Sequence, residues 1–372
     1  MDLCIKKFIE FEAKDWDKFV YSNSMGWAHL LYDVTSIDRF SYWKNLSFGI
    51  VNKDNNDEIY MLVQLYKTPK NLNSRWGYIL KDNLSKKQFN KVKICFQSYI
   101  QEIINKYSIE DFSISLPPLS EKNNPKNCSL VNPLIYFNFF PKLRYTSIID
   151  LSKPDEKMLA DCEETTRQAI RKLKKSDKYE IVESTGSKKD LEEYIKLHKE
   201  TYTRTGAISG IINDKYHENM FFNLIPKGIC RVFFLKNKQT KKYIASVAIL
   251  IFKNTAYYWW GSSTNYKEIG INKYLLFNVI CIVRESFNKT GYFETGGTYI
   301  YLRNGKSKGL TDYKKCFGTF LHPIYMGSYL SSETKIKTKN NNSKNKIKKR
   351  KIKIDKKINI KKIEKSGNLI FQ

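Results

Sequence analysis

Transfer of an already activated acyl group is the chemistry that the residue types of this chain best allow. Its four histidines lie far from metal-ligand spacing to one another: His29, His198, His217 and His322. A Gly-x-Ser-x-Gly elbow, a Walker loop and a Gly-x-Gly-x-x-Gly fingerprint are all missing from the sequence, so hydrolase, kinase and Rossmann interpretations lack motif support. A thioester or an aminoacyl ester needs chiefly alignment with an attacking amine. Lysines or backbone amides that face the developing oxyanion lower the barrier further.

A glycine-containing segment, Lys267-Glu268-Ile269-Gly270-Ile271-Asn272, follows the aromatic strand predicted at 257–260 and precedes a predicted helix. It is a degenerate form of the GNAT pyrophosphate loop, whose pattern is Arg or Gln, two residues, Gly, one residue, then Gly or Ala. In such a loop glycine lets the backbone approach phosphate oxygens, and the helix N-terminus presents free amides. Lys267, Gly270 and Asn272 are therefore predicted to bind the cofactor part of a donor. An ordinary helix start is the alternative interpretation.

A helix is predicted from Ser152 to about Lys175, with Pro154 and two acids at its start. Its apolar side carries residues at helical spacing: Leu159, Cys162, Thr166, Ile170 and Leu173. Arg167, Arg171 and Lys174 line another side, at spacings of four and three. This arrangement offers a row of cations to an anionic ligand.

Five segments between residues 145 and 318 occur in the order found in the FemAB-like branch of the GNAT superfamily, and this part of the chain resembles that branch. The segments are Thr146 to Ser152; Arg167 through Arg171 and Lys172; Gly261-Ser262-Ser263; Tyr292-Phe293-Glu294-Thr295-Gly296-Gly297; and Tyr313-Lys314-Lys315-Cys316-Phe317-Gly318. In the first half, Ser24-Met25-Gly26-Trp27-Ala28 looks like the opening segment of the family. The resemblance thus extends weakly over residues 1 to 330.

The resemblance implies tandem GNAT-like domains and transfer of an acyl or aminoacyl group. Peptidoglycan members of the family attach amino acids from charged transfer RNA to the stem peptide of a cell-wall precursor. Lys314 matches the family lysine that stabilises charge at the transferring carbonyl. Lys172 falls where an arginine contacts precursor phosphates, and Arg167 and Arg171 are neighbouring candidates.

The same resemblance gives roles to other residues. Glu294 replaces the usual aspartate, and it is expected to act as a base or as the ion-pair partner of a lysine. Gly296 and Gly297 are expected to let the strand end turn tightly beside the ligand. Tyr313 and Trp27 complete the predicted substrate contacts, with a core role for Tyr313 as the alternative. Leu31 stands where peptidoglycan members carry a lysine, which leaves the acceptor open.

The elements that must position these residues follow one order twice. The first half predicts strands at 46–51, 59–66 and 76–80, a helix at 86–106 and a strand at 111–116. The second half predicts strands at 231–235, 243–252 and 256–261, a helix at 272–288 and a strand at 292–295. We therefore expect an α+β fold of two GNAT-like domains, each a mostly antiparallel mixed sheet flanked by helices, at residues 1–145 and 146–330.

The net charge of +28 favours polyanionic partners, although a lysine-rich composition throughout accounts for part of it. Residues 333–372 hold 15 Lys and Arg against three acids. Residues 331–372 are expected to form a disordered tail, which is either a solvated appendage or a weak contact for RNA or an anionic membrane. Because neither a signal peptide nor an adequate membrane span is found, we expect a cytoplasmic protein, with attachment to the inner membrane face as an option.

The predicted function is transfer of an activated group onto an amine of a cell-envelope precursor. One version uses aminoacyl-tRNA and a nucleotide- or lipid-linked peptidoglycan precursor. A second uses a CoA thioester and a nucleotide-linked amino sugar of a surface polysaccharide. A third interpretation is a catalytically silent protein that binds RNA or a membrane. The seven scattered cysteines are expected to be small buried hydrophobes, and neither a metal nor a tightly bound cofactor is expected.

Overall fold

The computed structural model describes residues 2–36, 43–54, 58–206, 214–265, 268–299 and 306–329. Met1–Tyr329 forms one compact unit, which holds every element given below. The predicted tail at 331–372 lies outside the described residues. Among the described residues, no helix has the length and apolarity that a membrane crossing requires.

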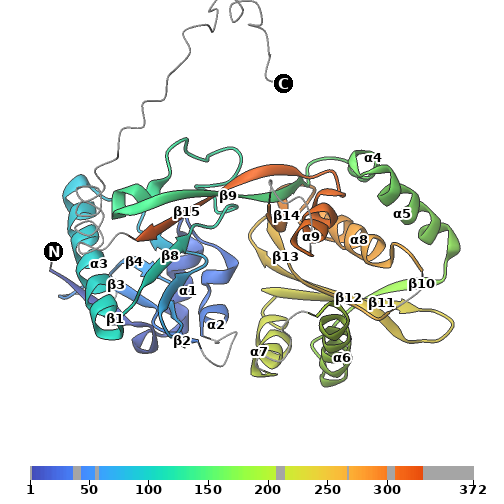
Figure 1. The fold of residues 1–372 in the computed structure, drawn as a ribbon, viewed down its shortest axis with the longest axis horizontal. Helices are drawn as coiled ribbons and strands as arrows, with labels where there is room; N and C mark the ends of the chain where they lie inside the picture. The colour runs from blue at the N-terminus through green and yellow to red at the C-terminus, as the bar shows by residue number, and fades with distance from the viewer. Residues whose placement is uncertain are drawn as a thin grey trace, which may run out of the picture. The chain divides into compact units, whose positions relative to one another are not determined.

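The first half contains short strands and one long helix (Figure 1). Its elements are β1 (Leu3–Lys7), η1 (Phe8–Glu10), α1 (Ala13–Ser22), η2 (Ala28–Leu30), α2 (Tyr32–Thr35), β2 (Lys44–Asn45), β3 (Phe48–Asn52), β4 (Ile59–Val63), β5 (Tyr66–Lys67), β6 (Asn71–Ser74), β7 (Tyr78–Leu80), α3 (Lys86–Tyr107), β8 (Asp111–Ser115) and η3 (Pro133–Phe137). Strands β1, β3, β4 and β7 form an antiparallel sheet.

The second half has longer strands with helices on both faces (Figure 1). Its elements are β9 (Phe139–Asp150), α4 (Asp155–Asp161), α5 (Glu164–Ser176), β10 (Tyr179–Glu183), α6 (Lys188–Thr205), α7 (Asp214–Asn219), η4 (Met220–Leu224), β11 (Cys230–Asn237), β12 (Tyr243–Phe252), β13 (Thr255–Ser263), α8 (Ile271–Ser286), β14 (Tyr292–Thr298), α9 (Lys306–Lys315) and β15 (Phe320–Tyr329). Helices α8 and α9 lie on one face of the sheet and α6 and α7 on the other.

The predicted repeat of strands and helix is confirmed. Strands β3, β4 and β7, helix α3 and strand β8 in the first half correspond to β11, β12, β13, α8 and β14 in the second. This is the α+β architecture expected from the sequence, with mixed sheets flanked by helices. The predicted strands at 59–66 and 76–80 are shorter than expected, because pairing between β4 and β7 covers only Met61–Val63 and Tyr78–Leu80.

A single sheet of eleven described strands crosses both halves, in the order β10-β11-β12-β13-β14-β9-β15-β8-β6-β5-β2. Strand β9 runs through the predicted boundary between residues 145 and 146, and β15 pairs with β8 of the first half. Residues at the sheet centre therefore lie where the two halves meet. The first predicted domain boundary, between residues 145 and 146, falls inside β9. The topology therefore does not test the predicted boundaries, which remain a prediction.

The single helix predicted from 152 to 175 is wrong, because two helices occupy this segment. Cys162 and Glu163 adopt extended backbone angles between α4 and α5. The Glu163 N–H donates to the carbonyl of Cys316 at 3.0 Å, and its own carbonyl accepts the N–H groups of Thr166 and Arg167. This bond to the segment after α9 replaces the helical bond that a continuous helix would form.

The hydrophobic core lies on both faces of the large sheet. One cluster joins the first half to the α6 and α7 side, with Trp16, Phe96 and Phe234 fully buried. The second cluster packs α5 and α8 against the sheet, with Leu275 and Phe293 at its centre. All seven cysteines are free, and Cys162, Cys230 and Cys316 are buried among these apolar residues while the other four are half-buried.

We predict that Gly291→Ala destabilises the fold strongly. Gly291 has a φ of +89°, and an added Cβ would lie 1.8 Å from the Asn254 carbonyl oxygen. Gly228, at φ +68° with nothing within 4 Å of an added Cβ, is the matched control. We expect a loss of about 1 kcal/mol for Gly228→Ala from backbone strain alone, and about 3 kcal/mol or more for Gly291→Ala. Equal losses in chemical denaturation would contradict the crowding seen at Gly291.

Candidate active site

The site is built where two neighbouring parallel strands separate. Strands β13 and β14 pair over three residue pairs only, the last of which is Tyr257 with Glu294. Beyond this pair, β13 continues beside β12 to Ser263, and β14 continues beside β9 to Thr298. The two strands therefore leave a gap at the sheet centre, which side chains from α9 can reach.

Lys314, near the end of α9, reaches this gap. Its Nζ donates a hydrogen bond to the carbonyl oxygen of Gly297 at 2.8 Å. Gly296 has a φ of +96°, and a Cβ added there would lie 3.1 Å from Lys314 Nζ. Glycine at this position thus supplies both the left-handed backbone conformation and the space that the ammonium group occupies.

Glu294 lies two residues before Gly296 in β14 and is 1% exposed. Its Oε1 accepts a hydrogen bond from the Thr146 hydroxyl at 2.7 Å. Among the described residues its Oε2 is buried without a hydrogen-bond partner. Buried carboxylate oxygens are normally satisfied, so an unpartnered one beside a cavity marks a candidate functional group.

Burial shifts the pKa values of these two groups toward each other. Loss of water raises the pKa of Glu294 to about 7, against the lowering effects of the Thr146 hydroxyl and of Lys314. Loss of water lowers the pKa of Lys314 to about 8; Glu294 opposes this shift and Arg75 adds to it. Near neutral pH the pair therefore holds a base and a cation, both of which can exchange a proton. Lys314 interacts with Glu294 electrostatically while its hydrogen bond goes to Gly297.

A cavity of about 540 Å³ opens in front of Glu294, between the two halves of the chain. Glu294 and Gly297 form one wall, and Arg75 and Arg144 supply two cations to the others. Hydroxyl and amide side chains complete the polar lining: Asn73, Ser74, Ser113 and Ser115. The cavity is thus suited to an anionic, hydrogen-bonding ligand whose reactive group approaches Glu294.

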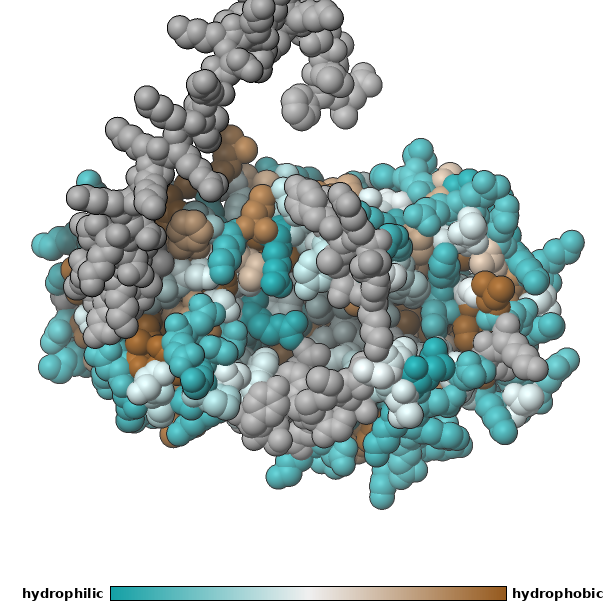
Figure 2. Space-filling model, in the orientation of Figure 1, coloured by the Kyte–Doolittle hydropathy of each residue, from teal (hydrophilic) through white to brown (hydrophobic). Residues whose placement is uncertain are grey.

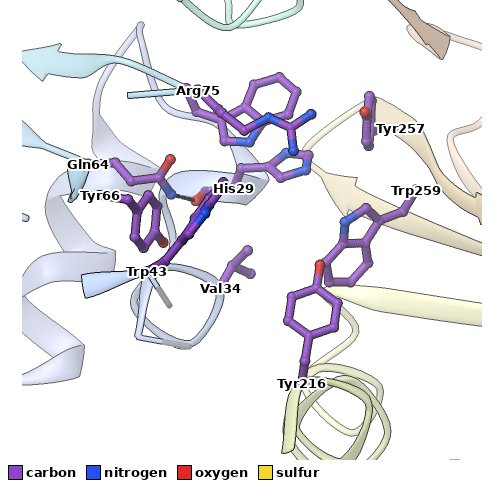
Figure 3. Close-up of a pocket in the computed structure, with 10 residues that line it drawn as sticks. His29, Val34, Trp43, Gln64, Tyr66, Arg75, Tyr216, Tyr257 and Trp259 are labelled. Carbon is purple, nitrogen blue, oxygen red and sulfur yellow. Dashed lines mark hydrogen bonds between the residues drawn. The ribbon is translucent and has the colours of Figure 1, made fainter. Parts of the chain in front are cut away.

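A smaller cavity of about 140 Å³ continues from the first, with which it shares four lining residues: Trp43, Arg75, Trp76 and Tyr257. Figure 3 shows His29 and Arg75 of the first half facing Tyr257, Trp259 and Tyr216 of the second. The His29 ring stacks on Trp76 at 3.9 Å and meets Tyr257 edge-on at 4.8 Å. Flat aromatic walls of this kind favour contacts with rings of a ligand.

A third cavity, of about 330 Å³, lies at the N-terminus of α8 on the other side of the gap. Gly270 and Asn272 line it together with Arg204 and Lys273. Gly270 is the N-cap, has a φ of +94° and makes no side-chain cap, and the first helical hydrogen bond runs from Tyr274 N–H to its carbonyl. The N–H groups of the first turn of α8 therefore make no hydrogen bonds within the helix, as the pyrophosphate-loop prediction requires.

Tyr313, the residue before Lys314, lines this third cavity. Its hydroxyl donates to the carbonyl of Asn272 at 3.2 Å, which ties α9 to the start of α8. Tyr313 is therefore half-buried beside a cavity, whereas Phe317 of the same segment is a core residue at 2% exposure. Lys267, the first residue of the predicted loop, lies outside the described residues.

The structure does not bring the predicted cations of α5 into the central cavity. Arg167 donates to the carbonyls of Ala160 and Cys162, and so holds the end of α4 instead. Arg171 and Lys172 are exposed on α5. Thr165 and Ala169 of α5 line the third cavity. Lys172 follows them at helical spacing, so it is on the side of α5 that borders that cavity.

Trp27 also lines none of the three cavities described above. It is 1% exposed and belongs to the core of the first half, because its short segment is packed between α1 and η2. Leu31, the residue that departs from the peptidoglycan members, is likewise fully buried. The opening segment contributes instead through His29, two residues after Trp27, which lines the aromatic cavity.

Several cavity residues were missed from the sequence. Arg75 and Trp76 come from the first half, and Arg144 comes from β9. These positions carry no recognisable motif. The aromatic run at 257–260 was predicted as a strand, and its ring-rich composition was the one available signal for an aromatic cavity wall. Thr146 lies inside a segment of the family resemblance but gave no sign of its bond to Glu294.

Comparisons with known proteins agree with this architecture. Residues 160–315 match the model of the acetyltransferase (GNAT) domain. No protein of curated function matches the chain in sequence. The fold is similar to that of FemX, with a TM-score of 0.65 and 16% identity over 91% of this chain and 99% of that chain.

Two further solved structures share the fold. One is the C-terminal domain of a putative lysylphosphatidylglycerol synthetase from Agrobacterium fabrum, with a TM-score of 0.55 and 11% identity over 89% of this chain and 95% of that one. The other is a tandem GNAT protein from the clavulanic acid biosynthesis pathway, with a TM-score of 0.53 and 9% identity over 88% and 98% of the two chains.

The domain match and the fold agree: residues 160–315 match a GNAT acetyltransferase domain, which supports an acyltransferase, and the chain has a GNAT-like fold. The similarity to FemX and to a tandem GNAT protein agrees with the tandem arrangement that the sequence resemblance implied. The identities are low, so the fold is what these structures share with the chain.

We predict that Glu294→Gln stabilises the protein increasingly as the pH rises. The folded-state pKa of Glu294 is raised from 4.5 to about 7. As the pH rises, the unfolded chain therefore releases this proton before the folded chain does, and the free energy of unfolding of wild type falls as the pH passes from 4.5 to about 7. The variant keeps the Thr146 contact and has no proton to release. Its gain should grow by about 2 to 3 kcal/mol between about pH 5 and pH 8 in denaturant titrations. A difference that does not change with pH would contradict the raised pKa.

Proposed function

We propose that this protein transfers an acyl or aminoacyl group from an activated donor to an amine of an anionic cell-envelope precursor. The observation that carries the proposal is the pairing of Glu294 and Lys314 at the gap between β13 and β14. One has a buried, unpartnered carboxylate oxygen beside a cavity, and the other is a half-buried cation within reach of the same cavity wall. No separate nucleophile is needed, because the donor is already activated.

In the proposed reaction, the acceptor amine attacks the carbonyl carbon of the donor directly. Oε2 of Glu294 takes the proton that the amine loses as the new C–N bond forms. The Lys314 ammonium neutralises the negative charge on the carbonyl oxygen. The C–S or C–O bond to the donor then breaks, and the leaving thiolate or alkoxide takes up one proton. The products are an amide and a free thiol or hydroxyl.

The central cavity is the proposed acceptor site. Arg75 and Arg144 suit a phosphate or pyrophosphate group, and the adjoining aromatic cavity suits a base or a sugar ring. A nucleotide- or lipid-linked precursor carries both kinds of group together with a free amine. FemX and the putative lysylphosphatidylglycerol synthetase domain share the fold, and the phospholipid in the name of the second supports an acceptor in the cell envelope. The stem peptide of peptidoglycan and an amino sugar of a surface polysaccharide are the two candidate acceptors.

The cavity at the start of α8 is the proposed donor site. Open first-turn amides, Arg204 and Lys273 fit the phosphate groups of a CoA thioester or of an aminoacyl-tRNA end. The two cavities flank the same short segment of α9, since Tyr313 lines the donor cavity and Lys314 reaches Gly297 in the acceptor cavity. A donor carbonyl that passes through the gap would meet Lys314 next to the acceptor amine.

The equivalent helix of the first half starts differently. Ser85 caps α3 by accepting from the Gln88 N–H, and the Gln88 side chain accepts from the Ser85 N–H. This capping box occupies one first-turn amide of α3, whereas Gly270 gives α8 no side-chain cap. The difference supports a donor site at the start of α8.

The function is tested by measuring transfer with purified full-length protein. Acetyl-CoA and aminoacyl-tRNA serve as donors, and UDP-linked muropeptide and UDP-linked amino sugars serve as acceptors. We expect turnover with one donor and one acceptor, and a fall in kcat of about a hundredfold or more for Lys314→Ala, which removes the oxyanion partner. Lys308→Ala, which removes a partly exposed lysine of the same helix that is paired with Asp312, should behave as wild type.

Two results would contradict the proposal. Near-normal turnover in Lys314→Ala would remove its assigned role. Absence of transfer with every donor, combined with binding of RNA or lipid vesicles, would favour the catalytically silent interpretation.

The proposed roles predict a narrow pH optimum. Glu294 must lose its proton to act as a base and Lys314 must keep its own to neutralise the oxyanion, so kcat should peak between about pH 7 and pH 8. Because Arg75 lowers the pKa of Lys314, Arg75→Gln should move the alkaline limb to higher pH. The acid limb, set by Glu294, should stay in place. An alkaline limb that does not move in Arg75→Gln would argue against Lys314 as the group that titrates there.

A further inference from the structure

The loop between β8 and β9 exposes large apolar side chains that do not line the candidate active site. Leu130 is fully exposed, and Val131, Ile135 and Tyr136 are 48%, 40% and 52% exposed. Leu143 of β9 belongs to the same surface. It pairs with Tyr325 of β15, and the Tyr325 hydroxyl donates to the carbonyl of Ser129, the residue before Leu130. These five residues form what we call the apolar loop face. Figure 2 shows hydrophobic residues at the upper edge, over the region where Figure 1 draws β9.

The loop is held in this conformation by bonds and by buried anchors. Asn132 accepts from the Leu134 N–H and donates to the Met326 carbonyl at 2.8 Å. Leu134 and Phe137 are buried, which turns the intervening Ile135 and Tyr136 outward. The apolar side chains are therefore presented by a fixed scaffold, and their exposure is built into the loop.

A cavity of about 630 Å³ lies behind the apolar loop face and shares Val131 and Tyr136 with it. Aromatic rings form its inner wall: Tyr78, Phe89, Tyr136 and Phe137. Lys86 and Lys122 stand at its edge and are exposed. The cavity also holds Asp82, which accepts from the N–H and the hydroxyl of Ser24, and Lys81, which is paired with Glu58. An apolar interior beside free lysines is complementary to lipids with anionic headgroups.

The chain continues from this region into its most basic segment. Tyr329, the last described residue, pairs with Phe139, two residues after the end of η3. Residues 333–372 then carry 15 Lys and Arg against three acids. The described residues thus end beside η3, and the basic segment follows in the sequence four residues later.

We propose that the apolar loop face, with Lys86 and Lys122 beside it, docks this protein on an anionic lipid bilayer. Leu130 and its neighbours enter the headgroup boundary, the aromatic cavity receives acyl-chain ends, and the lysines contact lipid phosphates. A second copy of the chain fits less well, because it would bring two surfaces of a molecule with net charge +28 together. An anionic membrane supplies both the apolar surface and the opposite charge.

The test uses full-length protein and vesicles of phosphatidylcholine alone or mixed with phosphatidylglycerol. The variant carries Leu130→Asp and Val131→Asp, and the matched control carries Ile9→Asp and Ile94→Asp, two exposed apolar residues outside this face. Both variants change the net charge equally, so any contribution of residues 333–372 is the same in each. Thermal unfolding confirms that both variants fold.

We expect wild type and control to partition onto the mixed vesicles, and less at high salt. The Leu130→Asp, Val131→Asp variant should partition at least about tenfold more weakly, because two apolar side chains lose their contact with lipid. Equal partition of variant and control, or absence of wild-type binding to the mixed vesicles, would overturn the proposal. A change from dimer to monomer in the variant, with unchanged partition, would assign the face to self-association and overturn it as well.

Discussion

The hydrogen bond from Lys314 Nζ to the Gly297 carbonyl is the interaction on which the candidate site depends. It places an ammonium group in the gap between two strands, near a carboxylate that is 1% exposed. Burial removes water from Glu294 and part of the water from Lys314, so the charged form of each is disfavoured and their pKa values shift toward neutrality. Gly296 makes this possible, because any side chain there would press on the ammonium group.

The duplicated fold places this pair between two unlike ligand sites. Both halves contain a strand followed by a crossover helix, yet α3 starts with a closed capping box and α8 starts with Gly270 and open amides. The first half contributes cations and aromatic rings to the central cavity through Arg75, Trp76 and His29. One copy of the design thus has the helix start that we propose binds phosphate, while the other supplies a wall of the central cavity.

Much of the fold was predictable, because strand alternation and helical spacing are local properties of the sequence. The order of β11, β12, β13, α8 and β14 followed from such patterns, and the family resemblance singled out Lys314 and the two glycines, which the structure brings into contact. The break at Cys162 was not predictable, since it depends on a hydrogen bond to Cys316 far along the chain. Arg167 looked like a ligand residue but binds carbonyls of α4. Arg75 and Arg144 were missed because only the closing of the sheet brings them to Glu294.

The protonation state of Glu294 tests the central claim most directly. Infrared difference spectra of wild type and Glu294→Gln, recorded across a pH titration, isolate the carboxyl stretch of this one side chain. The account predicts a protonated carboxyl band that disappears with a midpoint near pH 7. A midpoint at the ordinary value for glutamate, about 4.3, would show a solvated carboxylate and contradict a buried base beside Lys314.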